Sequence, residues 1–229
     1  MKKSFFLPRL STVLAACMLS FAAISAEINP KPFVIPELKS WTGAEGNTAL
    51  SGRIIVKSPA LKTTAQALAA DYEEMFGKKL TIAKGSAKAG DIVLALKKND
   101  GMGPEGYRLA IEKTVEITAA TAQGAFWGTR TLLQLSEQQK ERTLPCGTAF
   151  DEPQYELRGF MIDCGRKYIP ITYLRNLVKI MSYYKMNTLQ VHLNDNAFKQ
   201  YFNNDWFKTQ AAFRLESSYF PGLTAKDGH

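Results

Sequence analysis

The chain has 229 residues, of which 45% are hydrophobic and 22% charged, and its formal net charge is +8. This composition is typical of a soluble globular protein, and it excludes disordered, collagen-like and polytopic membrane proteins. Lysine and arginine are scattered, with no basic run longer than two. A nucleic-acid interface favours a basic stripe interleaved with aromatic residues. We therefore expect no nucleic-acid partner.

Residues 1–26 have the pattern of a secretory signal peptide. A basic start is followed by the apolar stretch from Leu10 to Ile24, and small residues precede Glu27. The stretch is short for a membrane span of about 20 residues, so we expect no transmembrane segment after cleavage. Without these residues the chain has 203 residues, and its formal net charge falls to +5. The pattern predicts export to the periplasm or the cell surface.

The segment from Leu14 to Cys17 (LAAC) also resembles a lipobox, in which Cys17 would be lipidated. This alternative predicts a surface lipoprotein. The apolar stretch before Cys17 is short and continues past it, which favours ordinary cleavage near Ala26.

Two cysteines, Cys146 and Cys164, remain after cleavage. Export permits a disulfide, but two cysteines do not make a disulfide framework. Neither cysteine has metal-ligand spacing to His192 or His229. We therefore expect no metal site and no cofactor.

Residues 27–50 contain several prolines and no sustained periodicity, which predicts an extended lead-in. Residues 51–152 then predict a small α+β domain, a sheet covered by two helices. Its predicted strands are 53–57, 91–96, 107–111 and 115–117, the last two forming a hairpin, and its predicted helices are 61–75 and 122–135. Gly77 is well placed to end the first helix.

Residues 143–155, with Pro145, Gly147 and Pro153, predict an interdomain connection, and a second domain occupies 153–229. The apolar run 159–164 is typical of a strand covered on both faces. Pro170 suits the first turn of a helix, and 188–193 is predicted to form a second strand. Strand, helix and strand over this length predict one right-handed βαβ unit with parallel strands.

Polar residues follow both of these predicted strands, Asp163-Cys164-Gly165-Arg166 after the first and His192-Leu193-Asn194-Asp195-Asn196 after the second. Function collects at the carboxyl ends of parallel strands. An arginine that faces aspartate and asparagine can hold a hydroxyl-rich ligand. The alternative is an ordinary arginine–aspartate ion pair that joins the two loops, and the spacing alone favours this alternative.

The block from Arg158 to Arg166, the helix after Pro170, Tyr184-Lys185-Met186-Asn187 and His192-Leu193-Asn194-Asp195 together resemble the start of the catalytic barrel of family-20 glycoside hydrolases, the β-N-acetylhexosaminidases. Residues 106–109, 121–128 and 131–135 are similar to the small domain that precedes this barrel. The resemblance covers roughly residues 50–229. It differs from the common family pattern at Lys167 and after Asp195.

This resemblance implies an α+β small domain followed by the first βα units of a truncated (β/α)₈ TIM barrel. The implied enzyme is a glycoside hydrolase that removes terminal β-linked N-acetylglucosamine or N-acetylgalactosamine from glycoconjugates. Arg166 matches the family arginine that holds the sugar hydroxyls, and Asp195 matches an aspartate of the polar network around the reaction centre. Asp163 and His192 match the motifs too, and we expect them to serve structure.

The family uses a substrate-assisted retaining mechanism, in which an Asp-Glu pair after the fourth barrel strand assists the acetamido group of the substrate. Residues 1–229 reach only the second predicted barrel strand, and a complete barrel typically needs about 250 residues. We therefore expect an N-terminal portion whose catalytic residues lie beyond His229, and an inactive 229-residue polypeptide. Asp151-Glu152 precedes the barrel, so we assign it no catalytic role. The alternative is a non-catalytic carbohydrate-binding or scaffold protein that retains the small domain.

Overall fold

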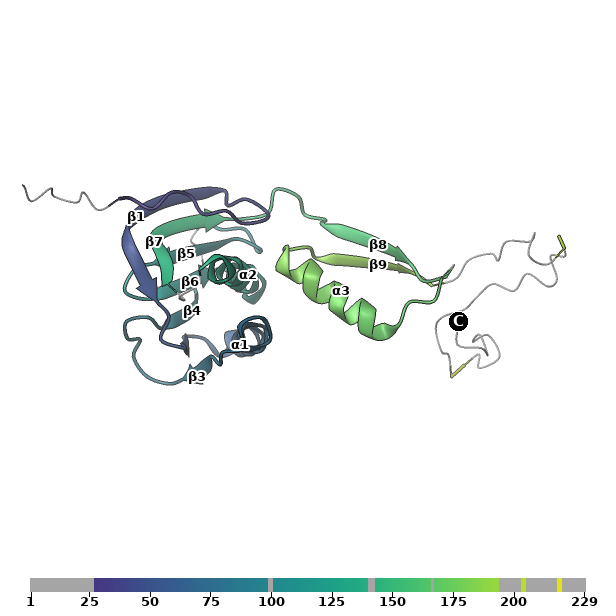
Figure 1. Ribbon diagram of the computed structural model, residues 1–229, viewed down its shortest axis with the longest axis horizontal. Coiled ribbons are helices and arrows are strands. Elements are labelled where there is room, and N and C mark those ends of the chain that lie inside the picture. Colours follow the sequence, from purple (N-terminus) through teal and green to yellow (C-terminus); the bar gives the residue numbers. More distant parts are fainter. Residues whose placement is uncertain are drawn as a thin grey trace, which may run out of the picture.

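The computed structural model describes residues 27–98, 101–139, 143–165 and 167–193, together with 203, 204, 218 and 219. These residues form a seven-stranded sheet with two helices on one face, followed by a two-stranded sheet with one helix (Figure 1). None of the helices in these ranges is long and apolar enough to cross a membrane.

The large sheet is mixed, with strand order β1-β7-β5-β6-β4-β2-β3. The strands β6, β4, β2 and β3 are parallel neighbours, whereas β1, β7, β5 and β6 pair antiparallel. Their bounds are β1 (Ser40–Ala49), β2 (Arg53–Val56), β3 (Thr81–Ala83), β4 (Ile92–Leu96), β5 (Tyr107–Ile111), β6 (Val115–Ala119) and β7 (Thr143–Asp151). The predicted strands and the predicted hairpin are confirmed, and β3 is an additional short strand.

Two helices, α1 (Lys62–Phe76) and α2 (Ala122–Gln138), cover one face of this sheet (Figure 1). A short 3₁₀ turn, η1 (Pro59–Leu61), leads into α1. Gly77 ends α1 in the left-handed conformation, with φ 63°, as the sequence predicts. The Thr121 hydroxyl caps α2 by accepting a hydrogen bond from Gly124 N at 3.1 Å.

The core lies between the sheet and the two helices. Alternate residues of the hairpin strands point into it, because side chains in a strand alternate between its faces. Leu132 and Leu133 of α2 and Leu68 of α1 complete it, each with no exposed surface. The buried hairpin residues are Tyr107, Leu109, Ile111, Val115, Ile117 and Ala119.

Two predicted connections contain strands instead. The predicted lead-in over 27–50 is wrong for residues 40–49, which form β1, and the predicted connection over 143–155 is wrong for 143–151, which form β7. β1 is a largely exposed edge strand with a shifted register between Gly43 and Asn47, so it lacks apolar alternation. Gly147 lies inside β7 because a Cβ there would come within 2.4 Å of the Trp41 ring.

The second part is the predicted βαβ unit, formed by β8 (Gly159–Asp163), α3 (Ile171–Tyr183) and β9 (Thr188–His192). Its strands are parallel, in register from Gly159 opposite Thr188 to Asp163 opposite His192. The expectation that β8 is covered on both faces is wrong for this structure, since Phe160 and Met161 are 47% and 54% exposed. Among the described residues, only β9 pairs with β8.

Candidate functional site

The carboxyl ends of β8 and β9 lie side by side, as the sequence predicts. Asp163 is directly opposite His192 in the parallel register. The His192 carbonyl accepts hydrogen bonds from Cys164 N at 2.8 Å and from Gly165 N at 3.0 Å. The backbone that follows β8 is therefore held against the last residue of β9.

Asp163 shapes the turn after β8. Its Oδ1 accepts a hydrogen bond from Gly165 N at 2.9 Å, which closes an aspartate turn over two residues. Cys164 lies inside this turn and is 3% exposed. These contacts fix the backbone of the turn as far as Gly165. The His192 side chain is exposed.

Arg166 and Asp195, which the resemblance identifies as substrate-binding, lie outside the described residues. The same holds for Cys17, the lipidation alternative, and for the signal peptide over 1–26. Within the described ranges, no group of three or more His, Cys, Asp and Glu side chains is arranged to hold a metal ion. Cys146 and Cys164 form no disulfide there.

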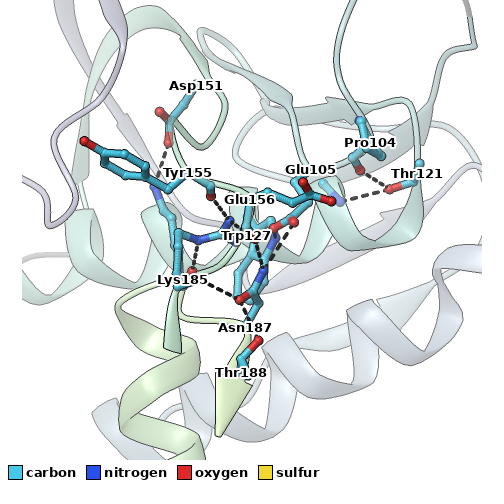
Figure 2. Close-up of polar contacts among 12 residues, drawn as sticks. Pro104, Glu105, Thr121, Trp127, Asp151, Tyr155, Glu156, Lys185, Asn187 and Thr188 are labelled. Carbon is cyan, nitrogen blue, oxygen red and sulfur yellow. Dashed lines mark hydrogen bonds and ion pairs between the residues drawn. The ribbon is translucent and has the colours of Figure 1, made fainter. Parts of the chain in front are cut away.

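The opposite, amino-terminal ends of β8 and β9 hold a second polar cluster, which joins the two parts of the chain (Figure 2). Arg158, immediately before β8, forms an ion pair with Glu105 of the small domain. Its Nε donates to the Lys185 carbonyl at 2.8 Å, and Nη1 donates to the Tyr155 carbonyl at 2.8 Å. Trp127 of α2 donates from Nε1 to the same Glu105 carboxylate at 2.7 Å.

Lys185, in the connection between α3 and β9, forms the second contact. It is 6% exposed, and its Nζ donates to Asp151 Oδ2 at 2.8 Å and to the Tyr107 hydroxyl at 2.9 Å. Tyr107 in turn donates to Asp151 Oδ2 at 2.7 Å, and its oxygen lies 2.5 Å from Thr131 Oγ1. Burial lowers the pKa of Lys185, while the Asp151 carboxylate opposes this change. Burial and the same carboxylate raise the pKa of Tyr107.

Asp151 is thus committed to a buried ion pair at the end of the strands remote from Asp163 and His192. In parallel barrels the amino-terminal face of the strands serves stability, whereas chemistry occurs at the carboxyl ends. This arrangement supports the prediction that Asp151 has no catalytic role.

Sequence reasoning did not assign a partner to Lys185, although it lies in a matched motif. Lysine is almost never fully buried unless it is paired, and its partner Asp151 lies 34 residues away in the chain. The backbone of Lys185 is left-handed, with φ 58°, where glycine is the expected residue. A sequence signal for this backbone conformation was available, because Lys185 lies just after a predicted helix.

Two family models match successive parts of the chain. The first, glycosyl hydrolase family 20, domain 2, matches residues 31–152. The second, the glycosyl hydrolase family 20 catalytic domain, matches residues 155–226. The two matches meet close to the change from the seven-stranded sheet to the βαβ unit.

Individual relatives agree with these matches. The lacto-N-biosidase of Bifidobacterium bifidum is 37% identical over 133 residues, which are 56% of this chain and 12% of that protein. β-Hexosaminidase subunit A2 of Dictyostelium discoideum is 26% identical over 94% of this chain and 39% of its own length. The chain therefore spans well under half the length of these curated relatives.

A solved structure has the same arrangement of domains. It is a mutant Streptomyces plicatus β-hexosaminidase in complex with the product GlcNAc, with a TM-score of 0.70 and 27% identity. The match covers 88% of this chain and 40% of that chain. The fold is therefore a small α+β domain followed by the first βα units of a TIM-barrel region.

Proposed function

Because the chain belongs to glycosyl hydrolase family 20, we propose that it is part of an exported β-N-acetylhexosaminidase, which removes terminal β-linked N-acetylhexosamine from glycoconjugates. The observation that carries this proposal is the succession of both family domains along one chain. The solved relative that holds GlcNAc supports a hexosamine substrate. The adjacent carboxyl ends of β8 and β9 support a sugar site that includes Arg166 and Asp195.

The proposed chemistry is substrate-assisted. The acetamido oxygen of the substrate attacks the anomeric carbon, while the bond from that carbon to the leaving oxygen breaks. A glutamic acid of the barrel protonates the leaving oxygen, and the neighbouring aspartate orients the acetamido group. Arg166 donates hydrogen bonds to the ring hydroxyls, and Asp195 accepts from the surrounding polar groups. Water then opens the cyclic intermediate with retention.

The test uses the product of the complete reading frame that contains these 229 residues, assayed with the 4-nitrophenyl β-glycosides of N-acetylglucosamine and N-acetylgalactosamine. We expect turnover of at least one of the two. Charged hydrogen bonds contribute about 1.5–3 kcal/mol each, so Arg166→Ala should lower kcat/KM by about 100-fold. Arg175→Ala, which removes an exposed arginine of α3, is the matched control and should leave kcat/KM unchanged.

The same assay separates the enzyme from the alternative. We expect the 229-residue polypeptide alone to hydrolyse neither glycoside above background. A reading frame that stops at His229 and yields an inactive product would contradict the enzyme and favour a non-catalytic carbohydrate-binding or scaffold protein.

Export is the second part of the proposal, and the composition of residues 1–26 supports it. Mass spectrometry of the protein purified from its native host should find an amino terminus near Glu27. A lipid-modified amino terminus at Cys17 would replace this prediction with a surface lipoprotein, and an intact Met1 would contradict both.

A further inference from the structure

We propose that Arg158 and Lys185 are positioning residues, through which the small domain sets the register of the sugar site. They hold the amino-terminal ends of β8 and β9, and Arg166 and Asp195 follow the carboxyl ends of the same strands in the sequence. The last step, from strand register to sugar binding, rests on the proposed function.

The first connection is made at the start of β8. The Arg158 guanidinium reaches Glu105, and both side chains are only 13% exposed. The guanidinium also lies 5.6 Å from the centre of the Trp127 ring of α2. Planar guanidinium groups make several directed hydrogen bonds at once, so this contact fixes orientation as well as distance.

The second connection is made just before β9. Lys185 enters a buried pocket of three polar side chains, Asp151 at the end of β7, Tyr107 on β5 and Thr131 on α2. All three belong to the small domain. Loss of one partner from such a buried ion pair is strongly destabilising, because the remaining charge stays buried. The connection therefore resists separation of the two parts.

The two connections are joined to each other. Asn187 N donates to the Arg158 carbonyl at 2.9 Å, and Asn187 Oδ1 accepts from Arg158 N at 3.0 Å. Figure 2 shows Asn187 and Glu105 in the same cluster, and Asn187 Nδ2 approaches Glu105 Oε1 at 3.4 Å. The starts of both strands thus share one set of partners on the small domain.

The two strands are short enough to carry this constraint from one end to the other. β8 and β9 have five residues each, and a strand rises about 3.3 Å per residue, so each spans roughly 15 Å. A two-stranded sheet is only marginally stable by itself. Partners that fix the starts of both strands therefore also restrict sliding at their far ends, where Cys164 N and Gly165 N meet the His192 carbonyl.

The test measures hydrogen exchange in the complete 229-residue chain. Lys185→Met should accelerate exchange of the Cys164 and Gly165 amides at least 10-fold. The double variant Lys185→Met/Asp151→Asn leaves no buried charge unpaired, so its small domain should stay folded while the same acceleration persists. Lys179→Met is the matched control, because it removes an exposed ion pair between α3 and Glu74 of the small domain. It should change nothing.

A kinetic readout on the product of the complete reading frame tests the last step. Lys185→Met/Asp151→Asn should lower kcat/KM about 10-fold, mainly through KM, and Arg158→Lys should retain part of the activity that Arg158→Ala loses. Unchanged exchange at Cys164 and Gly165 in both Lys185 variants would overturn the coupling, and unchanged kinetics would overturn the positioning role. A wild-type product without turnover would instead overturn the proposed function, while the exchange result would still decide the coupling.

Discussion

Asp91, the residue before β4, carries a fully buried carboxylate. Its Oδ1 accepts from Ser51 Oγ at 2.7 Å, its Oδ2 accepts from Lys88 N at 2.8 Å, and Arg53 Nη1 lies 3.4 Å from Oδ2. Burial raises the pKa of Asp91, but these donors outweigh it, so the pKa of Asp91 is lowered overall. The carboxylate therefore joins the start of β2 to the turn that precedes β4.

Asp91→Asn should lower the free energy of unfolding by about 1–3 kcal/mol at pH 7, because the charged hydrogen bonds are lost. The folded pKa is depressed, so the contribution of Asp91 is fully present above the unfolded value of about 3.9 and is lost as the pH falls through the folded value. Urea unfolding at pH 7, 4 and 3 should show the two curves converging.

Glu45→Gln, which changes an exposed carboxylate of β1, is the control for this comparison and should unfold like the wild type. A constant difference between wild type and Asp91→Asn from pH 7 to pH 3 would show that the Asp91 charge does not stabilise the fold.

Helix α2 packs against the hairpin of β5 and β6 in the small domain, and the two elements approach each other closely at Gly128. A Cβ at this position would lie 2.5 Å from Ile117 Cγ2 and 3.0 Å from Tyr107 Cδ2. Neither neighbour can move easily. Ile117 is fully buried, and the Tyr107 hydroxyl is held by Asp151. Because Gly128 has no side chain, the helix can lie this close to the sheet.

Gly128→Ala should therefore destabilise the protein, although alanine favours the helix by about 1 kcal/mol. Overpacking a filled core costs about 1–3 kcal/mol, and the effect should appear as a fall of several degrees in Tm. Thermal unfolding followed by circular dichroism measures it. Gln123→Ala, on the exposed side of the same helix, should not lower Tm. A higher Tm for Gly128→Ala would show that the helix can move away from the hairpin.

How well each element could be predicted depended on how it is buried. Helices α1 and α2 and the strands of the hairpin have clear apolar periodicity, because one face of each lies against the core. β1 and β7 lack this signal, since β1 is an exposed edge strand and β7 contains Pro145 and Gly147. Proline and glycine are typical of connecting segments. β1 and β7 can be recognised as strands only through their pairing with each other, which joins segments far apart in the sequence.

The candidate site could be predicted only in part, because local sequence patterns indicate parallel strand pairing but not ion pairs between distant residues. The adjacency of the carboxyl ends of β8 and β9 follows from parallel pairing, so it was predicted from the βαβ pattern and is confirmed, whereas the register that places Asp163 opposite His192 was not predicted. The ion pairs of Arg158 and Lys185 join residues that are 53 and 34 positions apart, and local patterns hold no information on such pairs. The positions of Arg166 and Asp195 remain predictions.

At the scale of the whole molecule, the two parts differ in how completely their apolar surface is covered. The small domain encloses a continuous core. Exposed strands and apolar patches favour association with other protein surfaces. In the βαβ unit, by contrast with the small domain, large apolar side chains of β8 and α3 are about half exposed. These side chains are Phe160, Met161, Ile171, Tyr173, Val178 and Ile180.

We therefore expect the 229-residue polypeptide to unfold locally in the βαβ unit well before the small domain opens. Hydrogen exchange should protect amides of 53–138 more strongly than those of 159–192, since protection follows the free energy of local opening. Equal protection of the two ranges would contradict this expectation. Deletion of 153–229 provides the control, because protection in the small domain should survive it.

The order of strands also bears on how the protein is made. β7 lies between β1 and β5, so residues 40–49 wait for a partner that is synthesised about 90 residues later. At about 5–20 residues per second, a ribosome needs roughly 5–20 s to produce that partner. Once β5 has been made, its edge stays unpaired until β7 follows about 30 residues later, and a chaperone can shield this edge or a second nascent chain can occupy it. When β7 pairs with β5, it covers that edge, and Asp151 at the end of β7 supplies the carboxylate that Lys185 later contacts.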